Sequence, residues 1–213
     1  MKSLITAAGM LSCSLVVAGC SASVADENRP VQDGAAETDA SSTVTPAGNT
    51  AAKDTKVIDR FQDLSVGADG TVTLSEDEWK KRLTDDQYYV ARKEGTERSF
   101  SNEYWDNHAE GTYHCVGCGL PLYESDTKYE SGTGWPSFYA PISEEAVETR
   151  IDRRFFSTRT EVHCHRCKSH LGHVFPDGPK PTGQRYCMNS AAMLFVPEGT
   201  EVIQPKPATG SEE

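Results

Sequence analysis

The sequence predicts a mainly β domain in which short helices at the N-terminal end precede antiparallel strands. After residue 111, Gly and Pro recur every few residues and separate short apolar runs such as Val162–Cys164, Val174–Phe175 and Met193–Val196. This pattern is typical of strands joined by tight turns. After Tyr104, no apolar stripe of helical period extends over more than two turns. The helices are therefore expected before the strands.

The composition allows one folded domain and argues against nucleic acid as a partner. The chain has 213 residues, of which 37% are hydrophobic and 25% are charged, enough for a core over part of its length. Its 32 Asp and Glu residues outnumber 21 Lys and Arg residues, so the net charge is −11. A surface that binds the phosphates of nucleic acid needs clustered positive charge. The acidic composition of this chain makes such a surface an unfavourable prediction.

Residues 1–19 resemble a bacterial lipoprotein signal peptide. Lys2 precedes an apolar stretch shorter than the roughly 20 residues of a membrane-spanning helix. Cys20 follows Val-Ala-Gly, as in a lipobox, which predicts cleavage before Cys20 and lipidation of its thiol. The alternative is an ordinary secreted protein that is cleaved near Ala22 or Ala25. Secretion of that kind does not require a cysteine at position 20. We expect a protein anchored by lipid alone to a bacterial membrane, on its periplasmic or cell-surface side.

The rest of the chain divides into a tether, a domain and a tail. Residues 20–56 are dominated by small and polar residues and contain no aromatic residue. They cannot bury enough apolar surface to offset the entropy of ordering, so we expect a disordered tether. Residues 57–198 are expected to form one domain, and residues 199–213 an unattached C-terminal tail.

Two capping boxes predict two short helices near the start of the domain. Ser75 with Glu78 begins the first helix, which runs through Leu83, and Thr84 with Gln87 begins the second. In a capping box, the first side chain accepts from the main-chain N–H three residues later, and the longer side chain returns the contact.

The spacing of four cysteines predicts a structural metal centre. Cys115 and Cys118 form one CxxC pair, Cys164 and Cys167 form a second, and two such turns supply the four thiolates of a tetrahedral Zn²⁺ site. The long segment between the pairs means that two separate hairpins must meet in space. A redox-active CxxC and two local disulfides remain as alternatives. A site of four cysteine ligands is closed, so its role would be folding stability.

Cys187 is the cysteine left over once the N-terminal region and the two CxxC pairs are set aside. A lone cysteine is commonly a small buried apolar residue. On a strand, however, Arg185 and Asn189 would share a face with Cys187, and a nearby cation lowers the pKa of a thiol. Cys187 is therefore a candidate nucleophile.

His170 and His173 are open to three interpretations. They could bind a metal, lie in the core or exchange protons. All six histidines lie between residues 108 and 173, and no triad pattern of carboxylates accompanies them in the sequence. Hydrolysis by an activated serine is therefore not indicated.

Five motifs occur in an order that resembles the B-type peptide-methionine-(R)-sulfoxide reductases. The resemblance covers about residues 76–197, nearly the whole expected domain. The combination is highly specific, although the doubled CxxC alone is weak evidence. The motifs are Glu78-Trp-Lys-Lys-Arg-Leu83, the two CxxC pairs, Gly134-Trp-Pro-Ser-Phe138, His170-Leu-Gly-His-Val-Phe175 and Arg185-Tyr-Cys-Met-Asn-Ser190.

The resemblance implies a β-tent-like fold of two antiparallel sheets, with structural zinc distant from the active site. Cys187 matches the nucleophile of the family. Trp135 matches an aromatic wall that receives the methyl group of the sulfoxide, a contact suited to a flat apolar face. Phe175 would be a further apolar contact, and Arg185 and Asn189 match polar groups that order the site.

The two histidines that match the family pattern suit the reduction of a sulfoxide. His170 and His173 match histidines near the sulfoxide oxygen. The sulfur is electrophilic only when that oxygen is protonated or strongly hydrogen-bonded, which calls for an acid of near-neutral pKa. The Cys187 thiolate would attack the sulfur, methionine would depart, and Cys187 would be left as a sulfenic acid.

One departure from the family pattern concerns recycling. Many relatives carry a resolving cysteine two residues before the tryptophan, where this chain has Thr133. With Cys13 cleaved away, Cys20 lipidated and the CxxC cysteines bound to zinc, no thiol remains to pair with Cys187. The resemblance therefore implies oxidised proteins as substrates and an external thiol donor, such as a thioredoxin-like domain, as reductant.

Two functions of other classes remain open. The chain could be a zinc-binding module without catalysis, in which Cys187 is a core residue. It could also be a dithiol oxidoreductase that uses a CxxC pair as its redox centre. Tightly bound metal at one ion per chain would leave no free CxxC pair and would exclude the second function.

Overall fold

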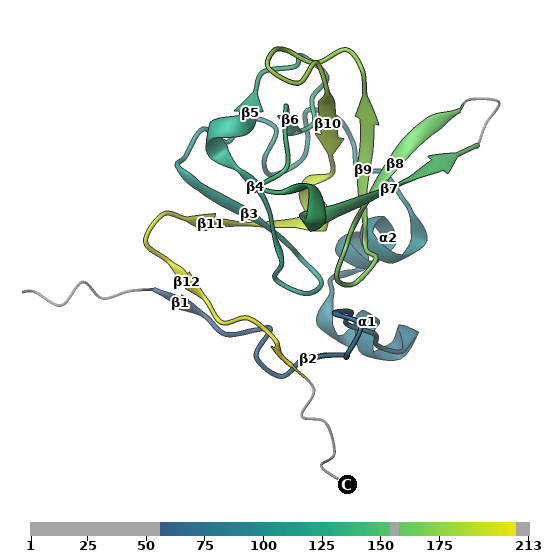
Figure 1. Ribbon diagram of the computed structural model, residues 1–213, viewed down its shortest axis with the longest axis vertical. Coiled ribbons are helices and arrows are strands. Elements are labelled where there is room, and N and C mark those ends of the chain that lie inside the picture. The colour runs from purple at the N-terminus through teal and green to yellow at the C-terminus, as the bar shows by residue number, and fades with distance from the viewer. Residues whose placement is uncertain (1–55, 154–157, 208–213) are drawn as a thin grey trace, which may run out of the picture. The chain divides into compact units, whose positions relative to one another are not determined.

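The computed structural model describes residues 56–153 and 158–207 (Figure 1). The predicted signal peptide and the predicted tether up to residue 55 lie outside the described residues. Two α-helices, a six-stranded sheet and a three-stranded sheet form most of the described part. Within it, no helix is both long and apolar enough to cross a membrane.

The two helices begin where the capping boxes predict. Ser75 caps α1 (Glu76–Arg82): its side chain accepts from the N–H of Glu78, and the Glu78 carboxylate accepts from the N–H of Ser75 at 2.8 Å. The N-terminus of α2 (Asp85–Lys93) has the same arrangement. Trp79 of α1 is 1% exposed and anchors this helix in the core. Both predicted helices are confirmed.

Nine of the thirteen strands in the described residues form two antiparallel sheets (Figure 1). The larger has the order β5-β6-β10-β9-β8-β7 and the smaller the order β11-β3-β4. The first comprises β5 (Lys128–Tyr129), β6 (Ser137–Phe138), β7 (Val147–Asp152), β8 (Arg159–Cys164), β9 (His170–Phe175) and β10 (Arg185–Met188), and the second β3 (Gly111–Cys115), β4 (Pro121–Glu124) and β11 (Met193–Pro197). Three 3₁₀ turns connect strands, η1 (Ser125–Thr127), η2 (Glu144–Ala146) and η3 (Ser190–Ala192).

Aromatic side chains join the two sheets. Tyr123 of β4 stacks on Phe138 of β6 with ring centroids 4.4 Å apart, and Tyr113 of β3 meets the same Phe138 edge-on at 5.0 Å. All three rings are completely buried. Such pairs contribute through both their apolar area and their ring geometry. The predicted mainly β fold of two antiparallel sheets is confirmed.

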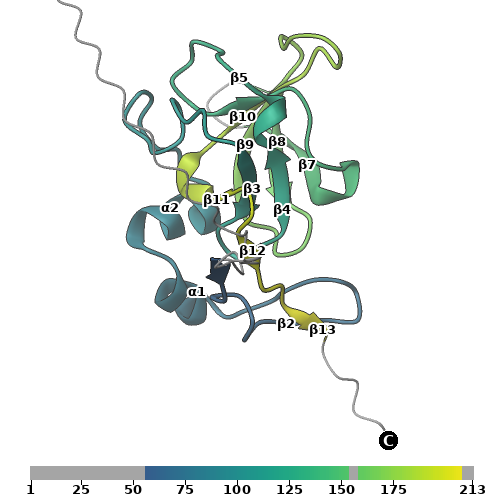
Figure 2. The same ribbon diagram turned by 90° about the vertical axis from the view of Figure 1, so that its left-hand side faces the viewer.

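The segment expected to be an unattached tail is partly structured. β12 (Glu201–Val202) pairs in parallel with β1 (Val57–Ile58), and β13 (Lys206–Pro207) pairs in parallel with β2 (Ser65–Val66); Figure 2 shows β2 and β13 side by side. The expectation is therefore corrected for residues 199–207, whereas residues 208–213 lie outside the described residues. The strands that pair with this segment lie at the start of the domain sequence. No pattern within residues 199–207 indicates such a distant pairing.

Candidate functional site

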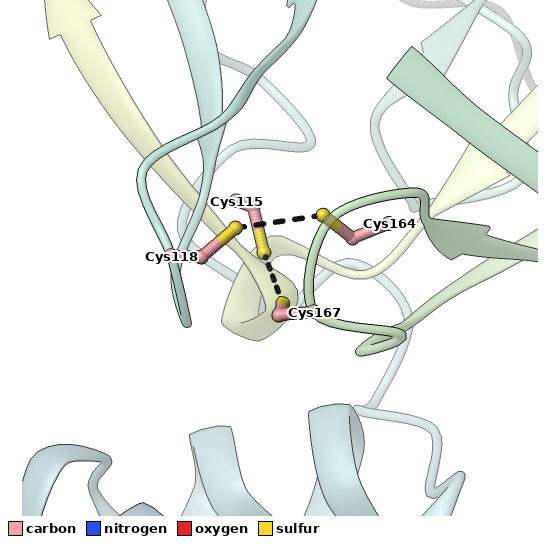
Figure 3. A group of neighbouring side chains, drawn as sticks. All are labelled: Cys115, Cys118, Cys164 and Cys167. Carbon is pink, nitrogen blue, oxygen red and sulfur yellow. Dashed lines mark hydrogen bonds between the residues drawn. The ribbon is translucent and has the colours of Figure 1, made fainter. Parts of the chain in front are cut away.

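Two tight turns bring four cysteine thiols together. Cys115 ends β3 and Cys118 lies in the turn that follows it, whereas Cys164 ends β8 and Cys167 lies in the turn before β9 (Figure 3). The four Sγ atoms lie within 4.8 Å of one another. Cys115 and Cys167 are 3.5 Å apart at Sγ, and Cys118 and Cys164 are 3.6 Å apart. All four side chains are buried.

The two turns close in the same way although their sequences differ. Gly119 has φ of 72° and donates its N–H to the carbonyl of Cys115 at 2.9 Å. Lys168 has φ of 57° and donates its N–H to the carbonyl of Cys164, also at 2.9 Å. Glycine adopts this left-handed conformation without strain, whereas lysine does not. The second turn is therefore formed in spite of its local sequence.

The spacing of the thiols fits a bound metal ion. Tetrahedral zinc with Zn–S bonds of about 2.3 Å holds its sulfur ligands roughly 3.8 Å apart, whereas a disulfide joins sulfurs at about 2.05 Å. The two sulfur contacts given above join one turn to the other, and all four cysteines are free, so the alternative of one local disulfide within each CxxC pair does not fit. Burial raises the pKa of Cys164 well above its usual range, so four thiolates in this place need a cation.

Cys187 lies in the middle of the six-stranded sheet. It is on β10, directly opposite His173 of β9 and Ser137 of β6, and its side chain is half-buried. The hydroxyl oxygen of Thr133, in the loop before β6, is 3.8 Å from the Cys187 Sγ. Ser131 contacts the hydroxyls of both Thr133 and Ser137, at 2.8 and 2.7 Å. The Cys187 thiol thus lies between hydroxyl-bearing residues on one side and β9, which carries His173, on the other.

The register of the ladders extends this site across five strands. His173 is opposite Glu161 of β8, and Glu161 is opposite Arg150 of β7. Side chains at directly opposite positions of paired strands point to the same face of a sheet. Ser137, Cys187, His173, Glu161 and Arg150 therefore form one polar row across one face.

His170 is paired with a buried carboxylate. Its Nδ1 is 2.7 Å from Oε1 of Glu161, and Oε2 of the same carboxylate accepts from the Nε of Arg150 at 2.6 Å. Both His170 and Glu161 are 3% exposed. Burial alone would raise the pKa of Glu161, but the hydrogen bonds from Arg150 and His170 outweigh it and lower that pKa. An ionised carboxylate only accepts, so the proton of neutral His170 is assigned to Nδ1. Its buried Nε2 has no hydrogen-bond partner among the described residues.

His173 has an equivalent partner on β7. Its Nε2 is 3.1 Å from Oδ2 of Asp152, which also accepts from Arg159 at 2.7 Å. The hydrogen bonds from His173 and Arg159 outweigh the effect of burial and lower the pKa of Asp152. Burial lowers the pKa of His173 and of His170 in spite of the neighbouring carboxylates. Both rings are therefore neutral near pH 7.

Sequence reasoning missed these two carboxylates. Glu161 precedes His170 by 9 residues and Asp152 precedes His173 by 21, and the pairs meet only because β7, β8 and β9 are neighbours. The available signal for Glu161 was its place directly before the predicted strand Val162–Cys164, because a carboxylate there is costly to bury without a partner. Asp152 lay near none of the predicted strands.

Arg185 is fixed by a salt bridge and an aromatic ring. Its Nε and a terminal nitrogen bind the two carboxylate oxygens of Asp177 at 2.9 and 2.8 Å. The guanidinium carbon lies 4.4 Å from the centroid of Phe175, the residue opposite it on β9. The hydrogen bonds to Asp177 raise the pKa of Arg185. Phe175, expected as an apolar contact for substrate, thus supports Arg185, and Asp177 is a further residue that the sequence did not reveal.

Trp135 and Asn189 are held by the same residue. The indole N–H of Trp135 donates to the carbonyl of Glu97 at 3.2 Å. The side-chain oxygen of Asn189 accepts from the N–H of Glu97 at 3.2 Å, and its amide nitrogen donates to the carbonyl of Leu171 at 3.0 Å. Asn189 is 3% exposed, whereas Trp135 is half-buried. Glu97 was not among the residues that the sequence singled out.

Comparison with known proteins identifies the family. The SelR domain model matches residues 83–197. The chain is 54% identical over 121 residues to the peptide methionine sulfoxide reductase MsrB of Thiobacillus denitrificans, covering 57% of this chain and 92% of that protein. It is 55% identical over 131 residues to the protein of the same name in Methanosarcina barkeri, covering 62% and 92%. It is 56% identical over 124 residues to the chloroplastic peptide methionine sulfoxide reductase B1 of rice, covering 58% of each chain. The chain therefore belongs to the SelR domain family, with relatives named as MsrB-type peptide methionine sulfoxide reductases.

Proposed function

We propose that this chain reduces methionine-(R)-sulfoxide residues of oxidised proteins to methionine, with Cys187 as the nucleophile. The observation that carries the proposal is the position of Cys187 directly opposite His173, on a sheet face where each of two histidines is paired with a carboxylate. These residues lie within the matched SelR domain. A thiol beside groups that can exchange protons is what reduction of a sulfoxide requires.

The first step moves one oxygen atom from methionine to cysteine. The Cys187 thiolate attacks the sulfoxide sulfur and forms a bond between the two sulfurs, while the sulfoxide oxygen takes up a proton. The resulting hydroxyl group then moves to the Cys187 sulfur: the S–O bond of the substrate and the new S–S bond break as an S–O bond forms on Cys187. The methionine sulfur gains two electrons and the Cys187 sulfur loses two, so the products are methionine and a Cys187 sulfenic acid.

His170 and His173 are the candidate proton donors for that oxygen. In each neutral ring, one nitrogen donates to a carboxylate, so the other nitrogen can take up a proton. Glu161 or Asp152 then stabilises the imidazolium, which passes its proton to the sulfoxide oxygen. Because burial lowers the pKa of both rings, their protonated forms are stronger acids than an exposed imidazolium.

The remaining site residues would bind and orient the substrate. Trp135 offers a flat apolar face for the methyl group of the sulfoxide. Arg185, fixed by Asp177 and Phe175, and Asn189, fixed from both sides, order the polar part of the site.

Recycling of Cys187 would depend on an external thiol. The sulfenic acid condenses with a donor thiol to a mixed disulfide and water, and a second donor thiol releases Cys187 as a thiol. The other four cysteines of the described residues form the buried cluster, and Thr133 occupies the place beside Cys187. A thioredoxin-like domain outside the cytoplasm is the kind of donor that fits.

The four-cysteine cluster would hold one structural Zn²⁺. Its four ligands leave no open position for substrate or water, so the ion would contribute to folding rather than to the reaction. Its support is the sulfur spacing and burial described above. With all four thiols committed to metal, a CxxC redox centre has no free dithiol.

We also propose that Cys20 carries a lipid anchor, which would place the domain outside the cytoplasm. The support is the sequence Val-Ala-Gly-Cys after an apolar stretch. In a bacterial host, the full chain should incorporate labelled fatty acid and sediment with membranes, whereas Cys20→Ala should do neither. Equal labelling of the two chains would overturn this proposal.

The proposed activity is tested with a peptide that contains racemic methionine sulfoxide and with dithiothreitol as reductant. The R isomer alone should be consumed, and Cys187→Ser should abolish turnover while it retains the metal and the fold. A chain that folds and binds metal but consumes neither isomer would be the zinc-binding module. Disulfide reductase activity in metal-free protein, without sulfoxide reduction, would indicate the dithiol oxidoreductase.

A further inference from the structure

Glu97 contacts three separate parts of the candidate site. It lies in the long loop between α2 and β3, far in sequence from both Trp135 and the segment that follows Cys187. Its carbonyl accepts from the indole of Trp135, its N–H donates to Asn189, and its carboxylate reaches the 3₁₀ turn η3. One residue therefore joins the aromatic wall to the chain that carries the nucleophile.

The carboxylate of Glu97, which is distant in sequence, caps the N-terminal end of η3. Oε1 accepts from the N–H of Ser190 at 2.5 Å, and Oε2 accepts from the N–H of Ala191 at 2.8 Å. Asn189 stands at the N-cap position, where its side chain would ordinarily take this role. Its side chain makes no cap hydrogen bond, because it is bound to Glu97 and Leu171. Glu97 thus replaces the local cap and leaves the Asn189 side chain bound to the main chain of Glu97 and Leu171, two residues after Cys187.

The neighbouring loop residues reinforce the same connection. Asn102 donates to the carbonyl of Gly134 at 2.7 Å, directly before Trp135. The same Asn102 accepts from the hydroxyl of Ser190 at 2.7 Å. The loop therefore contacts both the Trp135 segment and the η3 segment at several points, and the Glu97 carboxylate is the charged contact among them.

We propose that Glu97 is a positioning residue, which sets the spacing between Trp135 and the segment that bears Cys187 and Asn189. The proposal rests on the proposed function, since that function assigns Trp135 and Asn189 to substrate. Charge-assisted hydrogen bonds from a carboxylate to main-chain N–H groups are short and strong. Small displacements of positioning groups can reduce turnover by about 100-fold.

The test compares Glu97→Ala, Glu97→Gln and the wild type. Alanine removes both acceptors, whereas glutamine keeps one and turns an NH₂ group toward a main-chain donor. With an R-sulfoxide peptide, well below the melting temperature of each variant, we expect kcat/KM to fall by about 10- to 100-fold for alanine and by less for glutamine. Zinc content and far-ultraviolet circular dichroism should stay unchanged. Glu110→Gln is the matched control, because Glu110 is exposed and its main-chain carbonyl contacts Glu198.

A second readout separates positioning from general stability. The chain has three tryptophans, and the indole N–H resonance of Trp135 can be assigned by its loss in Trp135→Phe. It should shift in Glu97→Ala, while that of Trp79, buried in α1, should stay in place. Full kcat/KM in Glu97→Ala, or an unmoved Trp135 resonance, would overturn the proposal. Lack of reductase activity in the wild type would refute the proposed function instead, and the resonance would still test the positioning.

Discussion

The hydroxyl oxygen of Thr133 lies 3.8 Å from the Sγ of Cys187, on the loop that also carries Trp135. A group that cannot be oxidised to a disulfide therefore stands where a second thiol would reach the nucleophile. The hydroxyl belongs to a small network with Ser131 and Ser137. This relationship determines how an oxidised Cys187 can be resolved.

The first prediction concerns the product of one turnover without reductant. The wild-type domain should carry a Cys187 sulfenic acid, or a mixed disulfide when an external thiol is present, because no other thiol contacts it within the described residues. Excess sulfoxide should then inactivate the protein, since sulfinic acid is not reduced by ordinary thiols. Mass spectrometry after trapping checks this. A loss of two hydrogens, mapped to a bond between Cys187 and a CxxC cysteine, would show that the prediction is wrong.

The second prediction concerns Thr133→Cys. The new sulfur would start near 3.8 Å from Cys187, and a modest shift of the loop closes that gap to the length of about 2.05 Å in a disulfide. After one turnover, the variant should lose two hydrogens at a bond between positions 133 and 187, and it should resist inactivation by excess sulfoxide. Thr133→Ser is the control and should behave as the wild type. Persistent sulfenic acid in the cysteine variant would mean that the loop cannot approach.

The third prediction concerns the metal. Purified domain should contain one Zn²⁺, and Cys118→Ser should lose it and melt at a sharply lower temperature. Binding to such a site contributes about 10 kcal/mol to folding, and a single missing ligand leaves three thiolates in a buried place. Cys187→Ser is the matched cysteine control, and it should keep both metal content and melting temperature. Active, stable protein without zinc would contradict the assignment.

The fourth prediction concerns acid. The pKa values of His170 and His173 are lowered by burial in the folded chain, so below about pH 6.5 the unfolded chain binds more protons and stability falls. The lowered pKa values of Glu161 and Asp152 act in the same direction at lower pH. The free energy of unfolding by urea should therefore decrease steadily from pH 7.5 to pH 4.

Glu161→Gln provides the matched variant for that measurement. It removes the charge that Arg150 and His170 bind, so it should be less stable than the wild type at pH 7.5. The difference should shrink only as the pH falls below about 4.5, where the wild-type carboxylate, whose pKa is lowered in the folded chain, begins to be protonated. A difference that stays constant with pH would show that the charge of Glu161 contributes nothing.

The sequence by itself determined the features whose partners are local. Ser75 and Glu78 are three residues apart, so the start of α1 follows from their side chains alone. Each CxxC turn closes within a few residues, and the alternation of apolar runs and turn residues indicated antiparallel strands. The candidate residues Cys187, His170, His173 and Trp135 were found because they lie in short motifs of a recognisable family.

Only the tertiary structure decided which groups those residues meet. The register of β7, β8 and β9 gives His170 and His173 their carboxylates, and Glu97 reaches Asn189 across 92 residues. The paired strands of residues 199–207 also depend on partners at the start of the domain. A hydrogen bond or an ion pair acts over a few ångströms of space, and chain folding, not sequence spacing, brings such distant groups within that range.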